Sequence, residues 1–462
     1  MASSPKIIVL DDDPTGSQTV HSCLLLLRWD VKTLCMGLAD TSPLLFVLTN
    51  TRAHAAADAA RITQEVCRNL KVALAKTGYS DISRLAANAP VDVKNYLIVS
   101  RSDSTLRGHY PLETDVISAE LGPFDAQFLV PAFLEGGRVT RNGTHYLQNQ
   151  NQLIPVHETE FAQDPGFGYH HSYLPDYIAE KTQGRITADQ VLCLKAYEQP
   201  SDYLAQLLAL QNHQQGVVDA VSQTDLNCFA QAVLIASSQG KRFLFRSAAS
   251  LLTAFANLPP QPIAAQEMGL TVQSPHPGVF IVGSYVQTTT VQLHALLRME
   301  KVAGIEVDLH HLRSNEGGNI DIQSDVLARI DTVRQRGQTP VVYTSRQTLK
   351  FATLADRLRF GSRVAELLAA IVQQLPSDLG YIVSKGGITS NILLSKGLNL
   401  STVRLLGQIL PGCNLVQTGP DHAFPHLPVV LFPGNVGQSQ DLVRVYQYLS
   451  RTPSQSEKTA GA

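Results

Sequence analysis

Three consecutive acids, Asp11, Asp12 and Asp13, are the first residues whose type and spacing could do chemistry. They directly follow a β-branched run, Lys6–Leu10, which predicts a strand. Adjacent carboxylates repel one another unless a cation, a hydroxyl or a shared proton offsets the repulsion. Such acids can bind hydroxyl groups, hold Mg²⁺ near phosphates or act as a general base. The alternative is a capped turn, in which one aspartate caps a helix.

Arginines follow two further predicted strands, Leu44–Leu48 and Asn95–Val99. Arg52 comes after the first strand, and Arg101 and Arg107 come after the second. If the strands are parallel, their carboxyl ends share one edge of a sheet, where ligands bind. A guanidinium holds a carboxylate through two parallel hydrogen bonds, so acids, hydroxyls and arginines together suit a polyhydroxylated carboxylic acid. The alternative for each arginine is an ion pair with a nearby aspartate.

The C-terminal half repeats a strand, a glycine turn and a helix three times; the turns are Gly283-Ser284, 384–390 and 433–437. Glycine lets the backbone approach a phosphate closely, and a helix N-terminus offers unpaired N–H groups. The pattern therefore predicts an anion site at the carboxyl edge of a second sheet, where Lys385 could place a charge on a phosphate. No GxxxxGK[ST] loop occurs, no GxGxxG follows a strand, and no HRD or DFG set is present.

Strand–helix alternation throughout the chain predicts an α/β fold of two domains, each with a mostly parallel sheet flanked by helices. We expect an N-terminal domain over residues 1–256, a proline-rich linker over 257–278 and a C-terminal domain over 279–450. Residues 451–462 are expected to be disordered. Between Thr140 and Glu198 the alternation fails, which predicts extended loops followed by a helix from Asp189.

The composition sets limits on partners and location. Among 462 residues the net charge is −2 and only 16% are charged, so no nucleic-acid or membrane-surface partner is indicated. The longest apolar runs are strand-sized, below the roughly 18 residues of a membrane-spanning helix. No signal peptide is recognised, and the six cysteines are scattered without a CxxC pair, so we predict a cytoplasmic protein without a metal site. Base rates favour a homodimer.

Four motifs in order carry a resemblance: Asp12–Gly16, Asp103–Gly108, Gly386–Ser390 and Pro433–Gly437. With this order and spacing, the chain resembles the four-carbon acid sugar kinase family over nearly its whole length. The resemblance implies an N-terminal domain that binds the sugar acid, a C-terminal domain that binds ATP, and phosphorylation of the terminal hydroxyl of threonate, erythronate or 3-oxo-tetronate. Mg²⁺ would come on the phosphates of ATP, and domain closure would exclude water.

The resemblance also implies roles for individual residues. Asp12 and Asp13 would orient or deprotonate the hydroxyl. The sugar acid would be bound by Arg52, Asp103, Ser104 and Arg107, and ATP by Ser284, Gly386, Gly387, Ile388, Thr389 and Gly434. Many members of the family carry an acid where this chain has Ile388.

Two other functions remain open from the residues. One is a nicotinamide-dependent sugar-acid dehydrogenase, against which the missing GxGxxG argues. The other is a non-catalytic protein that binds the sugar acid or a nucleotide.

Overall fold

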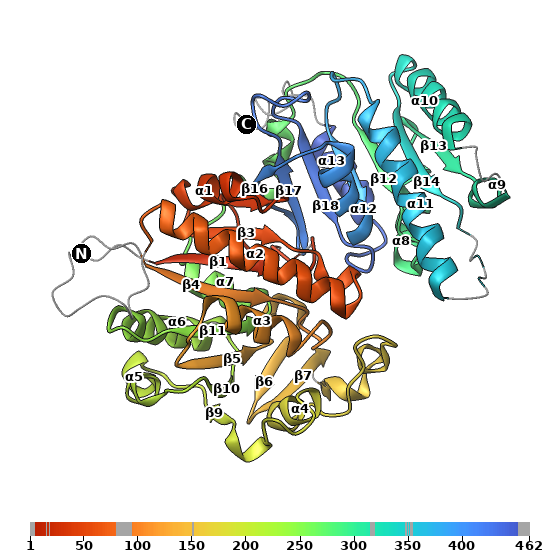
Figure 1. Cartoon of the computed structure of the whole chain (residues 1–462). Helices are drawn as coiled ribbons and strands as arrows, with labels where there is room; N and C mark the ends of the chain where they lie inside the picture. The colour runs from red at the N-terminus through yellow and green to blue at the C-terminus, as the bar shows by residue number, and fades with distance from the viewer. Residues whose placement is uncertain are drawn as a thin grey trace, which may run out of the picture. The chain divides into compact units, whose positions relative to one another are not determined.

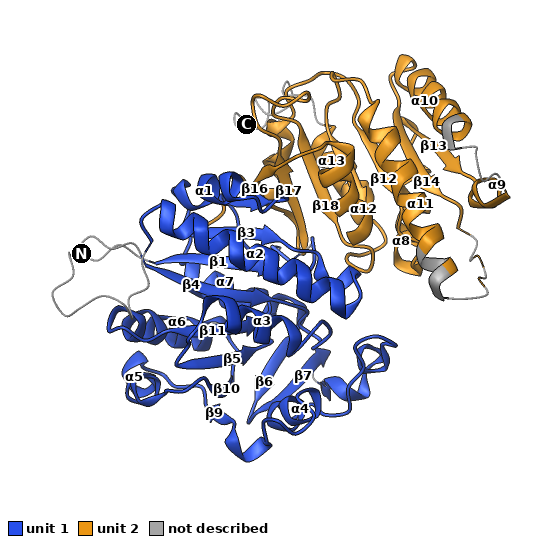
Figure 2. Cartoon of the chain, viewed as in Figure 1, with its two compact units in different colours: residues 1–259 blue, residues 260–462 orange. Residues whose placement is uncertain are grey.

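The computed structural model describes residues 5–450 except 15, 18, 80–94, 150–151, 315–318, 347–348, 350 and 352–353. The chain forms two compact units, Met1–Pro259 and Pro260–Ala462, which Figure 2 shows in blue and orange. The expected disordered tail, 451–462, lies outside the described residues, as does Thr15 of the first motif. No helix among the described residues is long and apolar enough to cross a membrane.

The main sheet of unit 1 is parallel throughout (Figure 1). Its strands, in spatial order, are β2 (Leu24–Leu26), β3 (Leu44–Leu48), β1 (Lys6–Asp11), β4 (Tyr96–Arg101), β11 (Phe243–Ser247), β5 (Ala126–Val130), β10 (Gln214–Val218) and β9 (Leu192–Leu194). Because β1 lies between β3 and β4, the residues that follow these three strands meet at one edge of the sheet.

Helices cover both faces of this sheet, as alternation along β11 illustrates. Leu244 packs in a core with α1 (Val31–Ala39), α2 (Ala56–Lys76) and α3 (Leu112–Leu121). Phe243 and Phe245 point to the other face, where they join Phe229 of α6 (Gln223–Ser238) and Phe255 of α7 (Ala249–Ala256). Successive side chains of a strand face opposite ways, so a strand that is apolar at every position is buried on both sides.

The segment expected to form extended loops is largely structured. It contains a three-stranded antiparallel sheet of β6 (Arg138–Arg141), β7 (Thr144–Asn149) and β8 (Gln152–Pro155). The β6–β7 turn is Asn142-Gly143, and both residues have positive φ (50° and 72°). A common type of two-residue hairpin turn requires positive φ at both positions. Helix α4 (Leu174–Lys181) follows, and the helix expected from Asp189 is instead a short 3₁₀ turn (Ala188–Gln190) before β9. Helix α5 is Pro200–Ala209.

Unit 2 has a mixed sheet whose spatial order is β13 (Val302–Val307), β14 (Thr339–Thr344), β12 (Val279–Val282), β15 (Ile382–Lys385), β18 (Pro428–Phe432), β17 (Cys413–Gln417) and β16 (Thr402–Leu410). All pairs are parallel except those of β17, which is antiparallel to both neighbours. Its helices are α8 (Gln287–Leu296), α9 (Leu309–Ser314), α10 (Asn319–Gln335), α11 (Leu354–Gln373), α12 (Gly387–Ile392) and α13 (Asp441–Leu449). The predicted α/β class with mostly parallel sheets is confirmed.

The core of unit 2 lies between α8, α13 and the central strands β12, β15 and β18. Part of the proline-rich segment 257–278 joins this core: Ala265–Thr271 forms a 3₁₀ helix, and its Met268 is fully buried. The strand order places the turns after β12, β15 and β18 next to one another, as a ligand site at their carboxyl ends requires.

Candidate active site

The three acids at the end of β1 lie in different environments. Asp11 and Asp12 are buried, whereas the side chain of Asp13 is 24% exposed. Burial is the main cause that raises the pKa of Asp11 to about 7. Arg101, whose Nη1 lies 3.3 Å from Asp11 Oδ1, opposes the rise, and the neighbouring Asp12 and Asp13 add to it. Of the three acids, only Asp13 has a side chain exposed enough to meet a ligand directly.

Arg52 connects the acids of two strand ends. Its guanidinium donates to Asp12, lies 3.2 Å from Asp13 Oδ2, and lies 4.0 Å from Asp103 Oδ1. Burial opposes the charge of Arg52, but the three carboxylates outweigh that effect and raise its pKa. The predicted residues Asp12, Asp13, Arg52 and Asp103 are therefore brought together, and the alternative of an ion pair holds for Arg52 in this structure.

A buried network of hydrogen bonds and an ion pair holds Asp12 in place. Ser102 Oγ donates to Asp12 Oδ2 at 2.7 Å and accepts from Arg246 Nη2 at 2.7 Å. Arg246 Nη1 lies 2.7 Å from Glu113 Oε2, so this arginine is itself neutralised. Gly108 has φ 126°, and a Cβ there would lie 2.7 Å from Ser102 Oγ and 2.8 Å from Arg246 Nη2, so only glycine lets the chain pass this close.

The loop after β4 carries the remaining predicted residues. Arg107 Nε lies 2.7 Å from Asp103 Oδ2, and this pairing, together with Arg52, outweighs burial and lowers the pKa of Asp103. Buried side chains hold three successive carbonyl groups of the loop: His145 at Ser104 (2.8 Å), Tyr169 at Thr105 (2.8 Å) and Tyr177 at Leu106 (2.9 Å). The loop is thus fixed by residues from β7 to α4.

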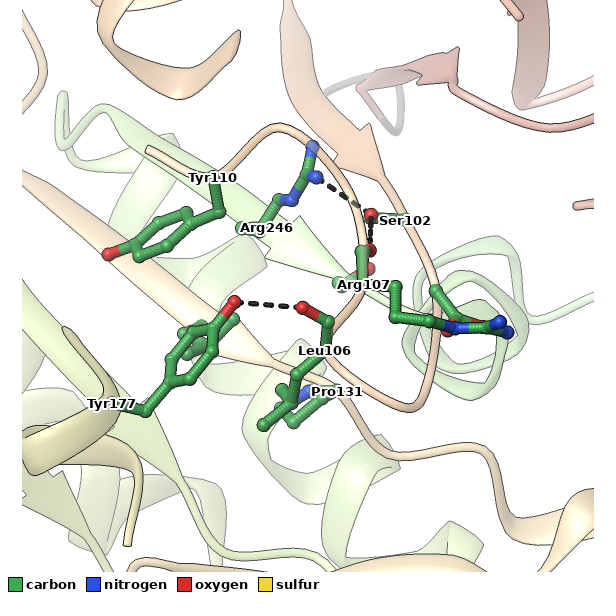
Figure 3. A pocket seen from close by; sticks show the side chains of 10 residues that line it. Ser102, Leu106, Arg107, Tyr110, Pro131, Tyr177 and Arg246 are labelled. Atoms are coloured by element: carbon green, nitrogen blue, oxygen red, sulfur yellow. Dashed lines mark hydrogen bonds and ion pairs between the residues drawn. The ribbon is translucent and has the colours of Figure 1, made fainter. Parts of the chain in front are cut away.

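A narrow pocket opens on this loop (Figure 3). It is lined by Ser102, Asp103, Leu106, Arg107, Tyr110, Leu129, Pro131, Tyr177, Arg246 and Ser247. Figure 3 shows Arg246 bonded to Ser102 on one side and Tyr177 bonded to Leu106 on the other. The lining therefore combines charged and hydroxyl groups with aromatic and aliphatic side chains.

In unit 2 the three glycine turns converge. Thr289 Oγ1 lies 3.1 Å from Ser284 Oγ and 2.8 Å from the carbonyl oxygen of Gly434. A Cβ on Gly434 would lie 2.5 Å from Ser284 Oγ, and a Cβ on Gly386 would lie 3.1 Å from Thr389 Oγ1. Ser284, Gly386, Thr389 and Gly434 therefore share one small region. Of the other predicted residues, Gly387 has open space where a Cβ would point, and Ile388 is 67% exposed.

Lys385 does not lie where a phosphate contact requires. Its side chain is fully buried, and Nζ donates to the carbonyl oxygens of Pro433 (2.6 Å) and Val436 (3.2 Å) while lying 3.7 Å from the centre of the Phe432 ring. The prediction that Lys385 meets a phosphate is wrong for this structure, because the side chain turns inward and fixes the neighbouring glycine turn.

The contribution of Lys385 to the stability of the protein should rise between pH 7 and 10. Burial is the main cause that lowers the pKa of Lys385 from its ordinary value of 10.5 to about 7. Cys413 and Asp441 oppose this lowering. Between these values the unfolded chain binds a proton that the folded chain does not, so raising the pH favours folding by up to about 1.4 kcal/mol per pH unit. Urea unfolding should show that the wild type gains stability relative to Lys385→Met as the pH rises from 7 to 10. A difference in unfolding free energy that stays constant with pH would contradict this.

Arg346, which follows β14 at the same edge, was not predicted as a site residue. Its Nη2 donates to the carbonyl oxygen of Ser284, and its buried Nε has no hydrogen-bond partner among the residues that the structure describes. The described residues contain no group of three or more His, Cys, Asp or Glu side chains that could hold a metal ion.

Two curated proteins are similar in sequence. The chain is 25% identical over 473 aligned positions to the D-erythronate kinase of Heliobacterium modesticaldum, covering 96% of this chain and 97% of that protein. It is 27% identical over 237 positions to the D-threonate kinase of Bordetella bronchiseptica, covering 50% of each.

Two solved structures share the fold. A Salmonella typhimurium LT2 protein matches with a TM-score of 0.64 at 17% identity, covering 96% of this chain and 99% of that one. A Haemophilus influenzae protein matches with a TM-score of 0.62 at 17% identity, covering 96% and 100%.

Two family models match successive parts of the chain. The sugar-binding N-terminal domain matches residues 7–255, more than half of the chain, and the nucleotide-binding C-terminal domain matches residues 279–442. The chain belongs to the four-carbon acid sugar kinase family, a family of phosphotransferases with an alcohol group as acceptor.

Proposed function

We propose that the protein transfers the γ-phosphoryl group of ATP to the terminal hydroxyl of a four-carbon sugar acid, such as threonate, erythronate or 3-oxo-tetronate. The observation that carries the proposal is the convergence of three glycine turns around Ser284, Gly386 and Gly434 in unit 2. Such turns let backbone N–H groups approach a polyphosphate. The similarity to proteins named D-erythronate kinase and D-threonate kinase supports the acceptor class.

On the nucleotide side, we propose that ATP contacts the convergent turns. The contacting residues are Ser284, Gly386, Gly387, Ile388, Thr389 and Gly434. The guanidinium of Arg346 lies at the same strand edge, and its unpartnered Nε suits a phosphate oxygen. Mg²⁺ enters with ATP and neutralises part of the phosphate charge.

On the acceptor side, the sugar acid binds at the acid and arginine cluster of unit 1, with Arg52, Asp103, Ser104 and Arg107 as its neighbours. Asp13 accepts the hydrogen bond of the terminal hydroxyl and takes its proton as the oxygen attacks the γ-phosphorus. The bond from the γ-phosphorus to the bridging oxygen breaks, and ADP leaves. Asp12 is buried, so its role is to hold Arg52 and Ser102 in place.

The test is ADP formation by the purified protein with Mg-ATP and each of a panel of four-carbon acids. The panel contains both stereoisomers of threonate and erythronate and the 3-oxo-tetronates. We expect one acid to stimulate ADP formation well above the rate with ATP alone. No stimulation by any acid in the panel would overturn the proposed acceptor class.

Replacement of Gly434 by alanine should impair ATP binding selectively. The new Cβ would lie 2.5 Å from Ser284 Oγ and 3.2 Å from Ser284 Cβ, so the two turns must move apart. We expect the KM for ATP to rise about tenfold, a cost of about 1.4 kcal/mol, with the KM for the acid unchanged. The matched control is Gly419→Ala, because a Cβ on Gly419 has no neighbour within 4 Å. Equal effects of the two variants on the KM for ATP would contradict the assignment.

Four further expectations from the sequence stay predictions. They are the domain division at 1–256, 257–278 and 279–450, a cytoplasmic location, the absence of nucleic-acid and membrane partners, and a homodimer. Light scattering coupled to size-exclusion chromatography would check the dimer.

A further inference from the structure

Five arginines lie in or near the acid cluster of unit 1, and four of them already hold a carboxylate. The four pairs are Arg52 with Asp12 and Asp13, Arg101 with Asp11 at 3.3 Å, Arg107 with Asp103 at 2.7 Å, and Arg246 with Glu113 at 2.7 Å. A guanidinium that is paired in this way has less capacity for a ligand carboxylate. The fifth arginine, Arg138, differs from the others.

Arg138 belongs to the β6–β7 hairpin, which is anchored to the loop after β4. It is the first residue of β6, two positions before Thr140, which pairs with His145 of β7. The ring of His145 lies 2.8 Å from the carbonyl oxygen of Ser104 and 3.0 Å from Thr140 Oγ1, which anchors the hairpin to the loop after β4. The charge of Asp103 accordingly acts on Arg138.

Within the described part of the chain, Arg138 has no anionic partner. Its Nη1 donates to the carbonyl oxygen of Gly136, and its buried Nε has no hydrogen-bond partner among these residues. No carboxylate of the described residues forms an ion pair with it. Burial lowers the pKa of Arg138. The negative charge of Asp103 opposes this lowering, and the positive charge of Arg107 adds to it. A partly desolvated cation is costly unless an anion meets it, so the site lacks one negative group.

The neighbours of Arg138 favour an organic acid over a free phosphate. Asp103 is 14% exposed and Asp13 is 24% exposed, and both offer acceptors for hydroxyl groups. Their negative charges would repel a dianionic phosphate more than a monoanionic carboxylate. A ligand with one carboxylate and several hydroxyls satisfies both kinds of group.

We propose that Arg138 binds the carboxylate of the sugar acid and so sets the preference for acids over neutral polyols. The inference rests on the proposed function for the identity of the ligand. Arg107 then stays with Asp103, and the hairpin β6–β7 acts as part of the binding site. His145 is a positioning residue, which aligns the hairpin with the loop that carries Asp103.

The test is calorimetric titration of threonate and erythronate, each compared with threitol or erythritol, which keeps the hydroxyls and lacks the carboxylate. The wild type should bind one acid roughly 100-fold more tightly than its polyol, as expected for two charge-assisted hydrogen bonds. Arg138→Gln should abolish this preference and leave the KM for ATP within twofold of wild type. Arg138→Lys should keep part of the preference, and it carries the test if the glutamine variant does not fold.

Arg141→Gln is the matched control, because Arg141 is exposed on the same strand. An acid preference retained in a folded Arg138→Gln or Arg138→Lys variant at the wild-type level would overturn the role of Arg138 while leaving the kinase proposal intact. Binding of an acid that depends on Arg138 without ADP formation would support the carboxylate site and overturn the kinase proposal. Failure of the wild type to prefer either acid would overturn the carboxylate site itself.

Discussion

Asp13→Asn should reduce kcat with the acid substrate by about 10² to 10⁴-fold, the usual contribution of a positioned general base. The asparagine keeps the size of the side chain and can still accept a hydrogen bond, but it cannot take the proton of the attacking hydroxyl. Because Asp13 is 24% exposed, the variant should fold normally. The measurement is steady-state kinetics with saturating ATP, together with a thermal unfolding curve.

Asp58→Asn serves as the control for Asp13. Asp58 is an exposed acid of α2 that lies 3.4 Å from Arg61, so it also loses an ion pair with an arginine on substitution. The control should keep wild-type kcat. If Asp13→Asn kept kcat within threefold of wild type, Asp13 would not be the base, and a base would have to be sought among the other exposed acids of unit 1.

Asp12→Ala should lower the free energy of unfolding of unit 1 by about 3 to 5 kcal/mol, the usual effect of removing one partner from a buried charge network. The substitution leaves Arg52 without its closest carboxylate and Ser102 without its acceptor. It also removes an acid near Arg246, 3.9 Å away. Since Asp12 holds Arg52 in place, the variant should be inactive as well.

The fluorescence of Trp29 can report the unfolding of unit 1 in this variant. Trp29 is the single tryptophan of the chain, and it packs against the core of α1–α3 in unit 1. Urea unfolding followed by its fluorescence therefore reports unit 1, even if the two units unfold separately. Asp58→Ala, which removes an exposed acid, should change the unfolding free energy by less than about 0.5 kcal/mol. A loss below about 1 kcal/mol for Asp12→Ala would contradict the buried network.

Several elements could be predicted closely from local pattern. The apolar run Leu44–Leu48 was predicted as a strand and forms β3 with the same bounds. The turns Gly283-Ser284 and 433–437 were placed after strands, and they directly follow β12 and β18. The β6–β7 hairpin was missed although Asn142-Gly143 is a recognised hairpin signal. The polar composition of the segment concealed it, because β7 is mostly half-exposed and lacks an apolar run.

The candidate site shows where local pattern stops being sufficient. The strand ends that carry Asp12, Arg52 and Asp103 were placed together because parallel strands share an edge. Arg246 and Glu113 reach Asp12 and Ser102 from positions far along the chain, and no local signal marks them. Lys385 was misplaced because spacing alone does not say whether a lysine beside a glycine turn points outward or into the core.

The most direct test of the central claim is identification of the product. The protein is incubated with Mg-ATP carrying a labelled γ-phosphate and the acid that best stimulates ADP formation, and the products are analysed by mass spectrometry and ³¹P NMR. We expect equal amounts of ADP and a sugar acid that carries the label as a phosphate ester on its terminal carbon. Label recovered only as inorganic phosphate, or on the acid's carboxylate, would contradict the proposed transfer to the terminal hydroxyl.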